Sequence, residues 1–320
     1  MKQEPCFLSV DWGTTHLRLR LVDRNTLQII DEIKTAEGVG VLGRDRLANG
    51  DVFGDVLARH FSALGKRHST NVDWCLISGM ASSSLGWKEL PYARTPLSLQ
   101  PRSLVILKLE WKSVSFPDLN VALVSGIRSS NDVMRGEECE LLGLIHLLPE
   151  LADHTAATVI MPGTHSKHAN LRNGMLTDFT TYMTGELFSH IQQMPTLATC
   201  FQENQDVFDE KTFRSGIEEF RRKGLPAALF TLRSRHVLNG MPFATSFLGG
   251  LLISAELDQL SARKDEKLFL CCSGEIQKNY MIAADCYKLS LQAIDAEMAD
   301  VACLHGHASI RNHLSRMTKG

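Results

Sequence analysis

A short polar turn near the start of the chain joins two apolar segments, and this feature constrains the fold more than any other. Residues Cys6–Val10 form a mostly apolar run, and the LRLRLV segment that begins at Leu17 alternates apolar and polar residues. A continuous apolar run is typical of a buried strand, and strict alternation is typical of a strand with one buried face. The intervening DWGTTH segment is therefore predicted to be the turn between two strands.

The rest of the first half continues with strand and helix patterns. Apolar residues recur at helical spacing over Val52–Leu64, and the apolar runs Trp74–Met80 and Val121–Ile127 are typical of buried strands. A third early strand is predicted over Leu27–Ile33, and a helix over Met134–Leu148. The predicted order is three strands, a helix, a strand, an insertion, a strand and a helix.

The second half begins with the same order of elements. Ala157–Gly163 is a predicted strand, and the next two strands flank Asn173 and Gly174, which favour a hairpin because both residues tolerate positive φ. The later predicted elements are a helix from Thr184, helices over Glu203–Lys223 and Phe243–Leu260, a strand over Leu268–Gly274, a helix, a strand over Leu289–Asp295 and a last helix. This order indicates a duplicated unit. The boundary is predicted between Leu148 and Ala157, with domains of residues 1–150 and 151–320.

Composition limits the classes of function that the chain can have. Hydrophobic residues make up 44% of the 320 residues, and the formal net charge is -2, so no nucleic-acid partner is expected. The apolar stretch from Met241 is shorter than the roughly 20 residues that span a bilayer, so no membrane partner is expected. The eight cysteines form no CxxC pair, which favours a reduced, cytoplasmic protein. The THSKH and HGH segments lack further ligands at zinc-site spacing, so no structural metal is expected.

The first polar turn carries the residue types that phosphate binding requires. Asp11 ends the first strand, and Gly13, Thr14 and Thr15 occupy the turn, where backbone N–H groups and hydroxyls can surround phosphate oxygens. An acid beside phosphates needs a cation, so Asp11 is predicted to hold Mg²⁺ through water. Arg18 could also reach a phosphate. The alternative is an ordinary hairpin turn, with threonine for β propensity and glycine for its φ angle.

A second turn occupies the equivalent position in the second half. In MPGTHSKH, Gly163 and Thr164 supply backbone donors and a hydroxyl, His165 follows them, and Lys167 supplies a cation. A simple Pro-Gly turn would explain the glycine but not the Thr-His-Ser-Lys segment. Two such turns facing each other across a cleft could bind a triphosphate from both sides.

The segment NDVMRGEE is the candidate catalytic segment. Asp132 is predicted to lie at a helix start, where it could accept a proton from a substrate hydroxyl, and the alternative is a helix N-cap. Arg135 could bind a substrate carboxylate or the transferring phosphate. Glu137 is a candidate substrate-binding residue, although Glu137 and Glu138 also suit the helix dipole and that alone could account for them.

Two further loops are candidates for binding. The loop after the Trp74–Met80 strand combines small hydroxyl residues with an aromatic residue, which suits a polyhydroxylated substrate as well as an ordinary loop. Its candidate residues are Ser82, Ser83, Ser84, Gly86 and Trp87. In CCSGEI, Ser273 and Gly274 end a strand where adenosine could pack against the backbone.

Together these segments resemble a known enzyme family. The segments DWGTTHLR, SGMASSSLGWKELPY, VMRGEECELLG, MPGTHSKH, DFTTYMTGEL and FLGGLLISAE are similar, in this order, to segments of the 2-dehydro-3-deoxygalactonokinase family. That family belongs to the sugar-kinase/actin/Hsp70 superfamily. The resemblance implies an α/β fold of two RNase-H-like (actin-like ATPase) domains, each with a mixed five-stranded sheet, and an ATP cleft between them.

The resemblance also implies an activity. It implies a kinase that uses ATP and Mg²⁺ to phosphorylate the 6-hydroxyl of 2-dehydro-3-deoxy-D-galactonate in galactonate breakdown. Two alternatives are a kinase for another sugar acid, such as 2-dehydro-3-deoxygluconate, and a non-catalytic ATP-binding sensor of the same fold. The expected partner is a small-molecule sugar acid, and a homodimer is expected only because it is the commonest oligomer.

Overall fold

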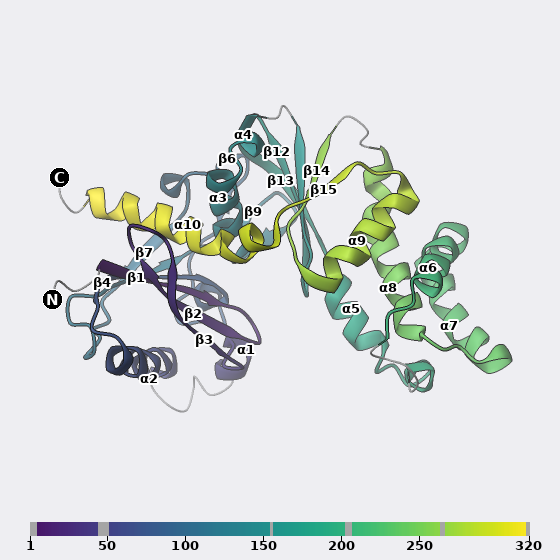
Figure 1. The fold of residues 1–320 in the computed structure, drawn as a ribbon, viewed down its shortest axis with the longest axis horizontal. Helices are drawn as coiled ribbons and strands as arrows, with labels where there is room; N and C mark the ends of the chain where they lie inside the picture. Colours follow the sequence, from purple (N-terminus) through teal and green to yellow (C-terminus); the bar gives the residue numbers. More distant parts are fainter. Residues whose placement is uncertain (1–4, 44–50, 154–155, 202–206, 263–265, 318–320) are drawn as a thin grey trace. The chain divides into compact units, whose positions relative to one another are not determined.

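The structure is a computed structural model that describes residues 5–43, 51–153, 156–201, 207–262 and 266–317 (Figure 1). Its contacts divide the chain into two compact units. The first unit contains residues 1–153, 174–177 and 301–320, and the second contains residues 154–173 and 178–300.

The first unit contains most of the strands. Its strands are β1 (Pro5–Trp12), β2 (Leu17–Asp23), β3 (Ile29–Thr35), β4 (Asn71–Gly79), β5 (Ala93–Arg94), β6 (Leu97–Ser98), β7 (Ile106–Leu109), β8 (Asn120–Val124), β9 (Ile127–Arg128) and β10 (Val133–Met134). Its helices are α1 (Val39–Leu42), α2 (Val52–Arg67), α3 (Glu137–Leu147), α4 (Glu150–Asp153), most of α10 (Ala296–Met317), and the short 3₁₀ helices η1 (Met80–Ser82) and η2 (Pro101–Ser103).

The main sheet of the first unit lies between two layers of helix. The strand order is β3-β2-β1-β4-β8-β7, with β1 antiparallel to β2 and parallel to β4. On one face, apolar side chains of β1 such as Leu8 and Val10 share a buried core with Phe61 of α2. On the other face, Ser9 Oγ contacts His307 Nδ1 of α10 at 2.8 Å. Figure 1 shows α2 and α10 on opposite sides of these strands.

The second unit repeats the strand arrangement around its central strand. Its strands are β11 (Ala157–Met161), β12 (Ser166–Arg172), β13 (Met175–Tyr182, which begins in the first unit), β14 (Lys267–Leu270) and β15 (Leu291–Ala293). Its helices are α5 (Thr184–Ile191), α6 (Glu210–Lys223), α7 (Leu225–Asn239), α8 (Ala244–Leu257), α9 (Gly274–Tyr287), η3 (Ala198–Phe201) and η4 (Asp258–Ala262). The strand order β13-β12-β11-β14-β15 matches the order β3-β2-β1-β4-β8 of the first unit. This match supports the duplication that the element order predicted.

The expectation of five-stranded sheets is wrong, because each large sheet has six strands. The additional strands are β7, antiparallel to β8, and β6, which pairs with Met175 and Leu176 of β13. Both come from the 97–109 part of the insertion in the first half. These strands have four and two residues, too few for a hydrophobic period to be visible in the sequence.

Several helix boundaries also differ from the predictions. The predicted helix from Met134 begins only at Glu137, because Met134 belongs to β10. The α7 helix was not predicted, although Gly224 precedes it and Pro226 lies in its first turn. The predicted helix start at Glu203 lies outside the described residues, and α6 begins at Glu210. The Asn173–Gly174 hairpin is confirmed, with φ values of 50° and 72°.

None of the described helices is long and apolar enough to cross a membrane.

Candidate active site

The turn between β1 and β2 has its carbonyl groups tied to a neighbouring segment. The carbonyls of Gly13, Thr14 and Thr15 accept hydrogen bonds of 2.9, 2.8 and 3.0 Å from N–H groups of residues 38–40. Within the described part of the chain, the backbone N–H groups of Thr14 and Thr15 donate no turn or loop hydrogen bond to another backbone group, and both residues are exposed. Backbone donors of exposed residues, together with their hydroxyls, suit the oxygens of a phosphate.

Two glycines allow this close approach. A Cβ at Gly38 would lie 2.2 Å from the Thr15 carbonyl carbon and 2.3 Å from Thr14 O, and a Cβ at Gly40 would lie 2.9 Å from Thr14 Cγ2. Any side chain at Gly38 would therefore displace the turn. Neither glycine was singled out from the sequence, although the Gly-x-Gly spacing in EGVGVLG was a visible signal.

Asp11 lies at the end of β1, directly before this turn. It is opposite Arg18 in the β1–β2 pair, and the residue is only partly exposed. Burial is the largest influence and raises the pKa of Asp11, Arg18 and Arg20 act to lower it, and Glu137 acts to raise it further. The net direction is upward. A carboxyl in this position would be stabilised in its charged form by a cation.

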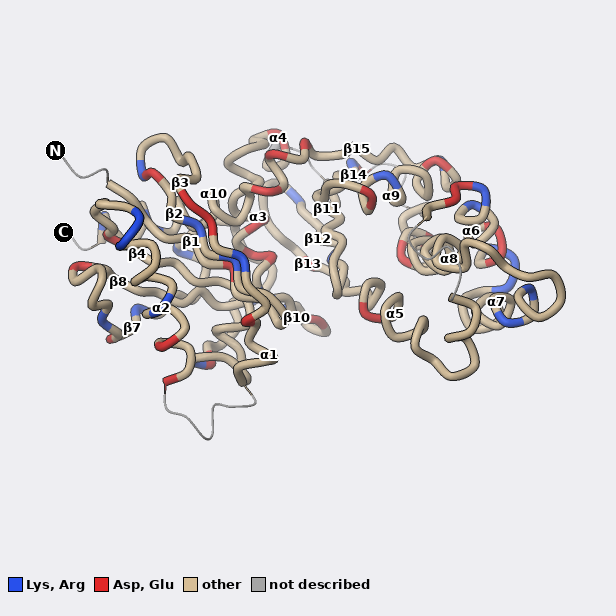
Figure 2. Tube along the Cα trace, turned by 60° about the horizontal axis from the view of Figure 1, so that its bottom comes forward, with Lys and Arg blue, Asp and Glu red and all other residues tan. Residues whose placement is uncertain are grey.

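Arg18 shares its carboxylate partner with other cations. Glu32 of β3 lies 3.6 Å from Arg18 Nε, 2.7 Å from Arg20 Nε and 2.8 Å from Lys34 Nζ. Figure 2 shows basic residues of β2 beside acidic residues of β3. Arg18 is thus placed between Glu32 and Asp11, and its contact with a phosphate stays a prediction.

The beginning of α3 carries two further carboxyls, of which Glu137 interacts with Asp11. Gly136, with φ 113°, precedes the helix and packs against Gly79 at the end of β4. Glu137 Oε2 accepts a hydrogen bond of 3.0 Å from Arg135 N, and Glu138 Oε2 accepts one of 2.6 Å from Gly136 N. Burial, with Glu137 as the second cause, raises the pKa of Glu138 to about 8, so Glu138 is protonated at neutral pH.

Asp132 occupies a different kind of position from the one expected. It lies in the turn between β9 and β10, five residues before α3, so it is not the N-cap of that helix. Its carboxylate accepts a 2.7 Å hydrogen bond from Val133 N, and its N–H donates to Ser129 Oγ at 3.1 Å. Glu137 is an acid that acts on Asp11. The assignment of Asp132 as a base stays a prediction.

Arg135 is held by the loop that follows β4. Its Nη1 donates to Ser82 O at 2.6 Å and to Ser82 Oγ at 2.7 Å, and its guanidinium lies 4.2 Å from the centre of the Tyr92 ring. Its Nε is buried and has no hydrogen-bond partner among the described residues. A ligand carboxylate could satisfy such a donor only after a local shift, and this role stays a prediction.

The serines of the same loop use their hydroxyls within the protein. Ser82 Oγ donates to Val124 O at 2.7 Å, and Ser83 Oγ donates to Met80 O at 2.7 Å. Both serines are buried, whereas Ser84 is exposed. The geometry of Ser82 and Ser83 is explained by loop structure, and their contact with a substrate stays a prediction.

Gly86 and Trp87 also have structural roles. A Cβ at Gly86 would lie 2.3 Å from Met80 O, so the loop needs glycine there. The Trp87 ring is 6.5 Å from the Phe53 ring and 5.9 Å from the Trp111 ring, at the edge of the core of the first unit. Their assignment to substrate binding stays a prediction.

The turn between β11 and β12 in the second unit is built like the first turn. Thr164 O accepts a 3.0 Å hydrogen bond from Glu186 N, and a Cβ at Gly185 would lie 2.5 Å from Gly163 O. His165 Nε2 lies 2.7 Å from Glu186 Oε2. As in the first unit, a helical segment that carries a glycine packs closely against the turn, and the turn residues themselves are exposed.

Lys167 differs from the other residues of this segment because it is almost fully buried, at 4% exposure. Its Nζ donates to His165 O at 2.7 Å, so the ammonium supports the turn from within. Contact with a phosphate would require the side chain to extend, and it stays a prediction.

A buried carboxylate that sequence reasoning missed lies below this turn. Glu256 of α8 accepts hydrogen bonds from Ser166 Oγ, Thr184 Oγ1 and Tyr280 OH, and lies 2.9 Å from His168 Nε2. Burial acts to raise the pKa of Glu256, but the interactions with His168, Thr184 and Ser166 outweigh it and the pKa is lowered. The sequence signal for this carboxylate was that the apolar FLGGLLISAE segment ends on an acid, Glu256.

The lowered pKa of Glu256 predicts a pH dependence of stability. Its contribution to the free energy of unfolding is fully present above the ordinary value of 4.5 and is lost as pH falls through the lower folded-state pKa. Glu256→Gln should therefore show a smaller loss of stability than the wild type as the pH falls below that value. Urea unfolding at a series of pH values measures this. Parallel curves for the two proteins would contradict the assignment.

Ser273 and Gly274 lie at the start of α9, after β14. Both are exposed, and Gly274 has a φ of 70° with no heavy atom within 4 Å of where its Cβ would lie. Gln277 Nε2 bridges Cys272 O and Ile294 O, at 2.9 and 3.2 Å, and fixes the neighbouring backbone. The open backbone at Gly274 can accept a flat ligand, and adenosine contact stays a prediction.

Comparison with known proteins relates these features to a family. The family model described as 2-keto-3-deoxy-galactonokinase matches residues 11–306. A protein named probable 2-dehydro-3-deoxygalactonokinase from Rhizobium meliloti is 30% identical over 315 residues, covering 92% of this chain and 93% of its own. The 2-dehydro-3-deoxygalactonokinase of Escherichia coli is 29% identical and covers 78% of this chain and 79% of its own.

A solved structure agrees with these matches. The crystal structure of a candidate 2-dehydro-3-deoxygalactonokinase from Sinorhizobium meliloti has a TM-score of 0.78 and 28% identity, covering 96% of both chains. Fold and sequence thus define a sugar-acid phosphotransferase. The chain belongs to the 2-keto-3-deoxy-galactonokinase family.

Proposed function

We propose that the chain transfers the γ-phosphoryl group of ATP to the 6-hydroxyl of 2-dehydro-3-deoxy-D-galactonate. The observation that carries the proposal is the β1–β2 turn, whose carbonyls are tied to residues 38–40 while Thr14 and Thr15 are exposed beside Asp11. Such a turn offers donors to phosphate oxygens. The family match supplies the substrate class, because both curated relatives are named for this sugar acid.

The residues around Asp11 fit a magnesium ion. No group of three or more His, Cys, Asp and Glu side chains in the described ranges could hold a metal by itself. Mg²⁺ does not need such a group, because it is commonly bound by one or two carboxylates together with water and substrate phosphates. Asp11 would hold the ion, with Glu137 as the neighbouring carboxylate. The ion would neutralise charge on the β- and γ-phosphates during transfer.

The chain's own residues would position the two reactants. The Gly13–Thr15 and Gly163–Thr164 turns would bind phosphate oxygens, and Ser273 and Gly274 would contact the adenosine. Glu137 would orient the attacking hydroxyl and accept its proton, because it begins α3 beside Arg135 and interacts with Asp11 at the end of β1. Asp132 is the alternative for this role. Arg135 and the Ser82–Trp87 loop would bind the carboxylate and hydroxyls of the sugar acid.

A panel of sugar acids tests the proposal. Purified protein is expected to release ADP from ATP fastest with 2-dehydro-3-deoxy-D-galactonate, and more slowly with 2-dehydro-3-deoxygluconate and other aldonates. The measurement is kcat/KM for each acid in a coupled assay. A higher value for another acid would contradict the substrate assignment, and ATP binding without transfer to any acid would favour a sensor.

A further inference from the structure

A cavity on the first unit is lined by histidine and arginine side chains that the proposed reaction does not use. Its volume is about 350 Å³, and its polar lining consists of His146, His305, Ser309, Asn312, His313 and Arg316. Five of these residues follow one face of α10 at helical spacing, and His146 lies in the last turn of α3. The remaining wall is apolar and includes Leu27 and Pro101.

A second cavity of about 390 Å³ adjoins the first along α10. It is lined by Arg24, Arg311, Ser315 and the shared residues Asn312 and Arg316. Neither cavity has an acidic side chain in its lining, although the chain has more acidic than basic residues. We refer to the two adjoining cavities as the α10 pocket.

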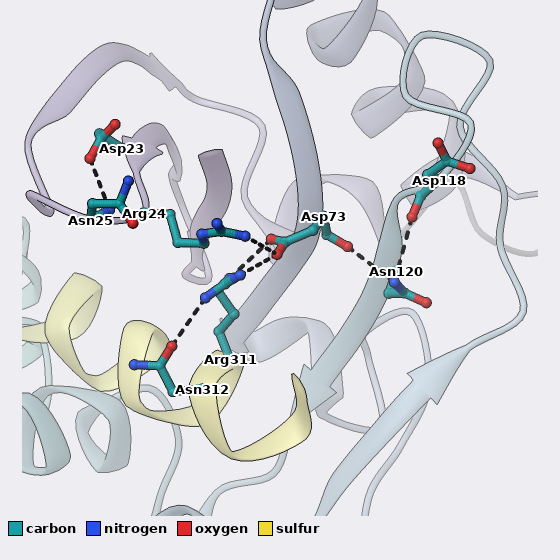
Figure 3. Close-up of polar contacts among 8 residues, drawn as sticks. All are labelled: Asp23, Arg24, Asn25, Asp73, Asp118, Asn120, Arg311 and Asn312. Carbon is teal, nitrogen blue, oxygen red and sulfur yellow. Dashed lines mark hydrogen bonds and ion pairs between the residues drawn. The ribbon is translucent and has the colours of Figure 1, made fainter. Parts of the chain in front are cut away.

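The arginines of the α10 pocket differ in how their charges are balanced. Arg311 is buried and pairs through two nitrogens with Asp73, which also lies 3.6 Å from Arg24 Nη1 (Figure 3). The Asp23 carboxylate also interacts electrostatically with Arg24. Arg316 forms no ion pair with a carboxylate of the described residues and is exposed. The uncompensated positive charge of the pocket therefore lies at Arg316.

The neighbouring polar groups are arranged as donors around this charge. Asn312 Oδ1 accepts a 3.0 Å hydrogen bond from Arg311 Nη1, as Figure 3 shows, so its amide nitrogen is left to donate elsewhere. His313 is adjacent in sequence and partly exposed. Burial, followed by His146, lowers the pKa of His305, so the permanent charge comes from arginine and not from this histidine.

We propose that the α10 pocket binds a small organic phosphate, with Arg316, Asn312 and His313 as the groups that contact the phosphate. Arginine matches the geometry of phosphate oxygens through paired N–H groups, and charge-assisted hydrogen bonds are the strong ones. The volume lies in the range of about 300–1,000 Å³ that is usual for small-molecule sites. A purely structural explanation is that basic residues compensate the helix dipole at the end of α10.

The pocket lies on the two helices that support the proposed catalytic end of the first unit. A Cβ at Gly143 of α3 would lie 1.8 Å from Ala302 O of α10, and a Cβ at Gly306 would lie 2.0 Å from Cys139 O. The backbones of α3 and α10 are therefore in direct contact, and α3 begins at Glu137. His146 Nε2 of α3 lies 3.2 Å from Ser309 Oγ of α10 in the pocket wall, so a ligand bound along α10 would act on both helices. This consequence rests on the proposed function, whereas binding itself does not.

Histidine side-chain NMR of the full chain tests the binding, with glycerol 3-phosphate as the probe. Its addition is expected to shift the ring signals of His313 in a saturable way, with glycerol as the neutral control. Arg316→Gln should weaken this binding about tenfold or more, because it removes charge-assisted hydrogen bonds. Lys112→Gln, which removes an exposed cation outside the pocket lining, should leave it unchanged.

Three results would overturn the proposal. The first is that glycerol 3-phosphate causes no saturable shifts, and the second is that Arg316→Gln binds it as tightly as the wild type does. The third is that the wild type binds malonate as tightly as glycerol 3-phosphate, which would assign the pocket to carboxylates. Kinase assays then test coupling separately. Glycerol 3-phosphate should change kcat of the wild type and not of Arg316→Gln, and an unchanged kcat with the pocket saturated would contradict coupling. An inactive enzyme would refute the proposed function without affecting the NMR result.

Discussion

Replacing Glu137 with glutamine is expected to lower kcat by about 10²- to 10⁴-fold, the usual contribution of a positioned general base. Glutamine has the same shape and can still accept the hydrogen bond from Arg135 N, but it cannot take the proton of the substrate hydroxyl. It also removes a negative charge beside Asp11. The KM for ATP should change much less than kcat. Steady-state kinetics with saturating magnesium measures both.

Two matched variants make this prediction specific. Glu138→Gln replaces a carboxyl whose pKa is raised to about 8, so at neutral pH it exchanges one neutral group for another and should leave kcat within a few-fold. Asp132→Asn tests the alternative base in the β9–β10 turn, and it should also have a small effect. A large loss for Asp132→Asn together with a small loss for Glu137→Gln would reverse the assignment.

Gly38→Ala is expected to lower kcat/KM for ATP by about 10²-fold, because a displacement of about 1 Å in a positioning element can have an effect of this size. The added Cβ would lie 2.2 Å from the Thr15 carbonyl carbon and 2.3 Å from Thr14 O, which is closer than atoms can approach. The β1–β2 turn would have to move, and its donors would move with it. The loss should appear in ATP binding and in kcat.

Gly65→Ala is the control for this substitution. Gly65 is an exposed position in α2 of the same unit, where a Cβ would meet Ser115 Cβ at 3.5 Å and Phe116 Cζ at 3.8 Å, both ordinary contacts. Alanine should stabilise this helix by about 0.5–1 kcal/mol and leave kinetics unchanged. Thermal unfolding of both variants separates a general loss of stability from a local effect. If folded Gly38→Ala bound ATP as the wild type does, the turn would not be the phosphate site.

Much of the fold could be predicted from local sequence patterns. The apolar run at Cys6–Val10, the alternation after Leu17 and the Asn173–Gly174 pair each report a local backbone preference, and the structure has the corresponding strands and hairpin. The equivalence of the two polar turns followed from the order of elements. It is matched by the same strand order around β1 and around β11.

Other features depend on contacts between distant residues, which one sequence does not show. The strands with which β6 and β7 pair are decided by the sheets that each one joins. Strands of two and four residues are too short to show a hydrophobic period in the sequence. The prediction that Asp132 starts a helix did not anticipate β10, in which Val133 and Met134 pair with β9. The roles of Gly38 and Glu256 depend on contacts with residues that are distant in the sequence.

Analysis of the reaction product by ³¹P and ¹³C NMR tests the central claim most directly. After incubation of the full chain with ATP, Mg²⁺ and 2-dehydro-3-deoxy-D-galactonate, we predict a new phosphomonoester signal and phosphorus coupling at C6 of the sugar acid. Glu137→Gln should form the same product far more slowly. Release of inorganic phosphate without a phosphorylated sugar acid, or a phosphate on another carbon, would contradict the proposed reaction.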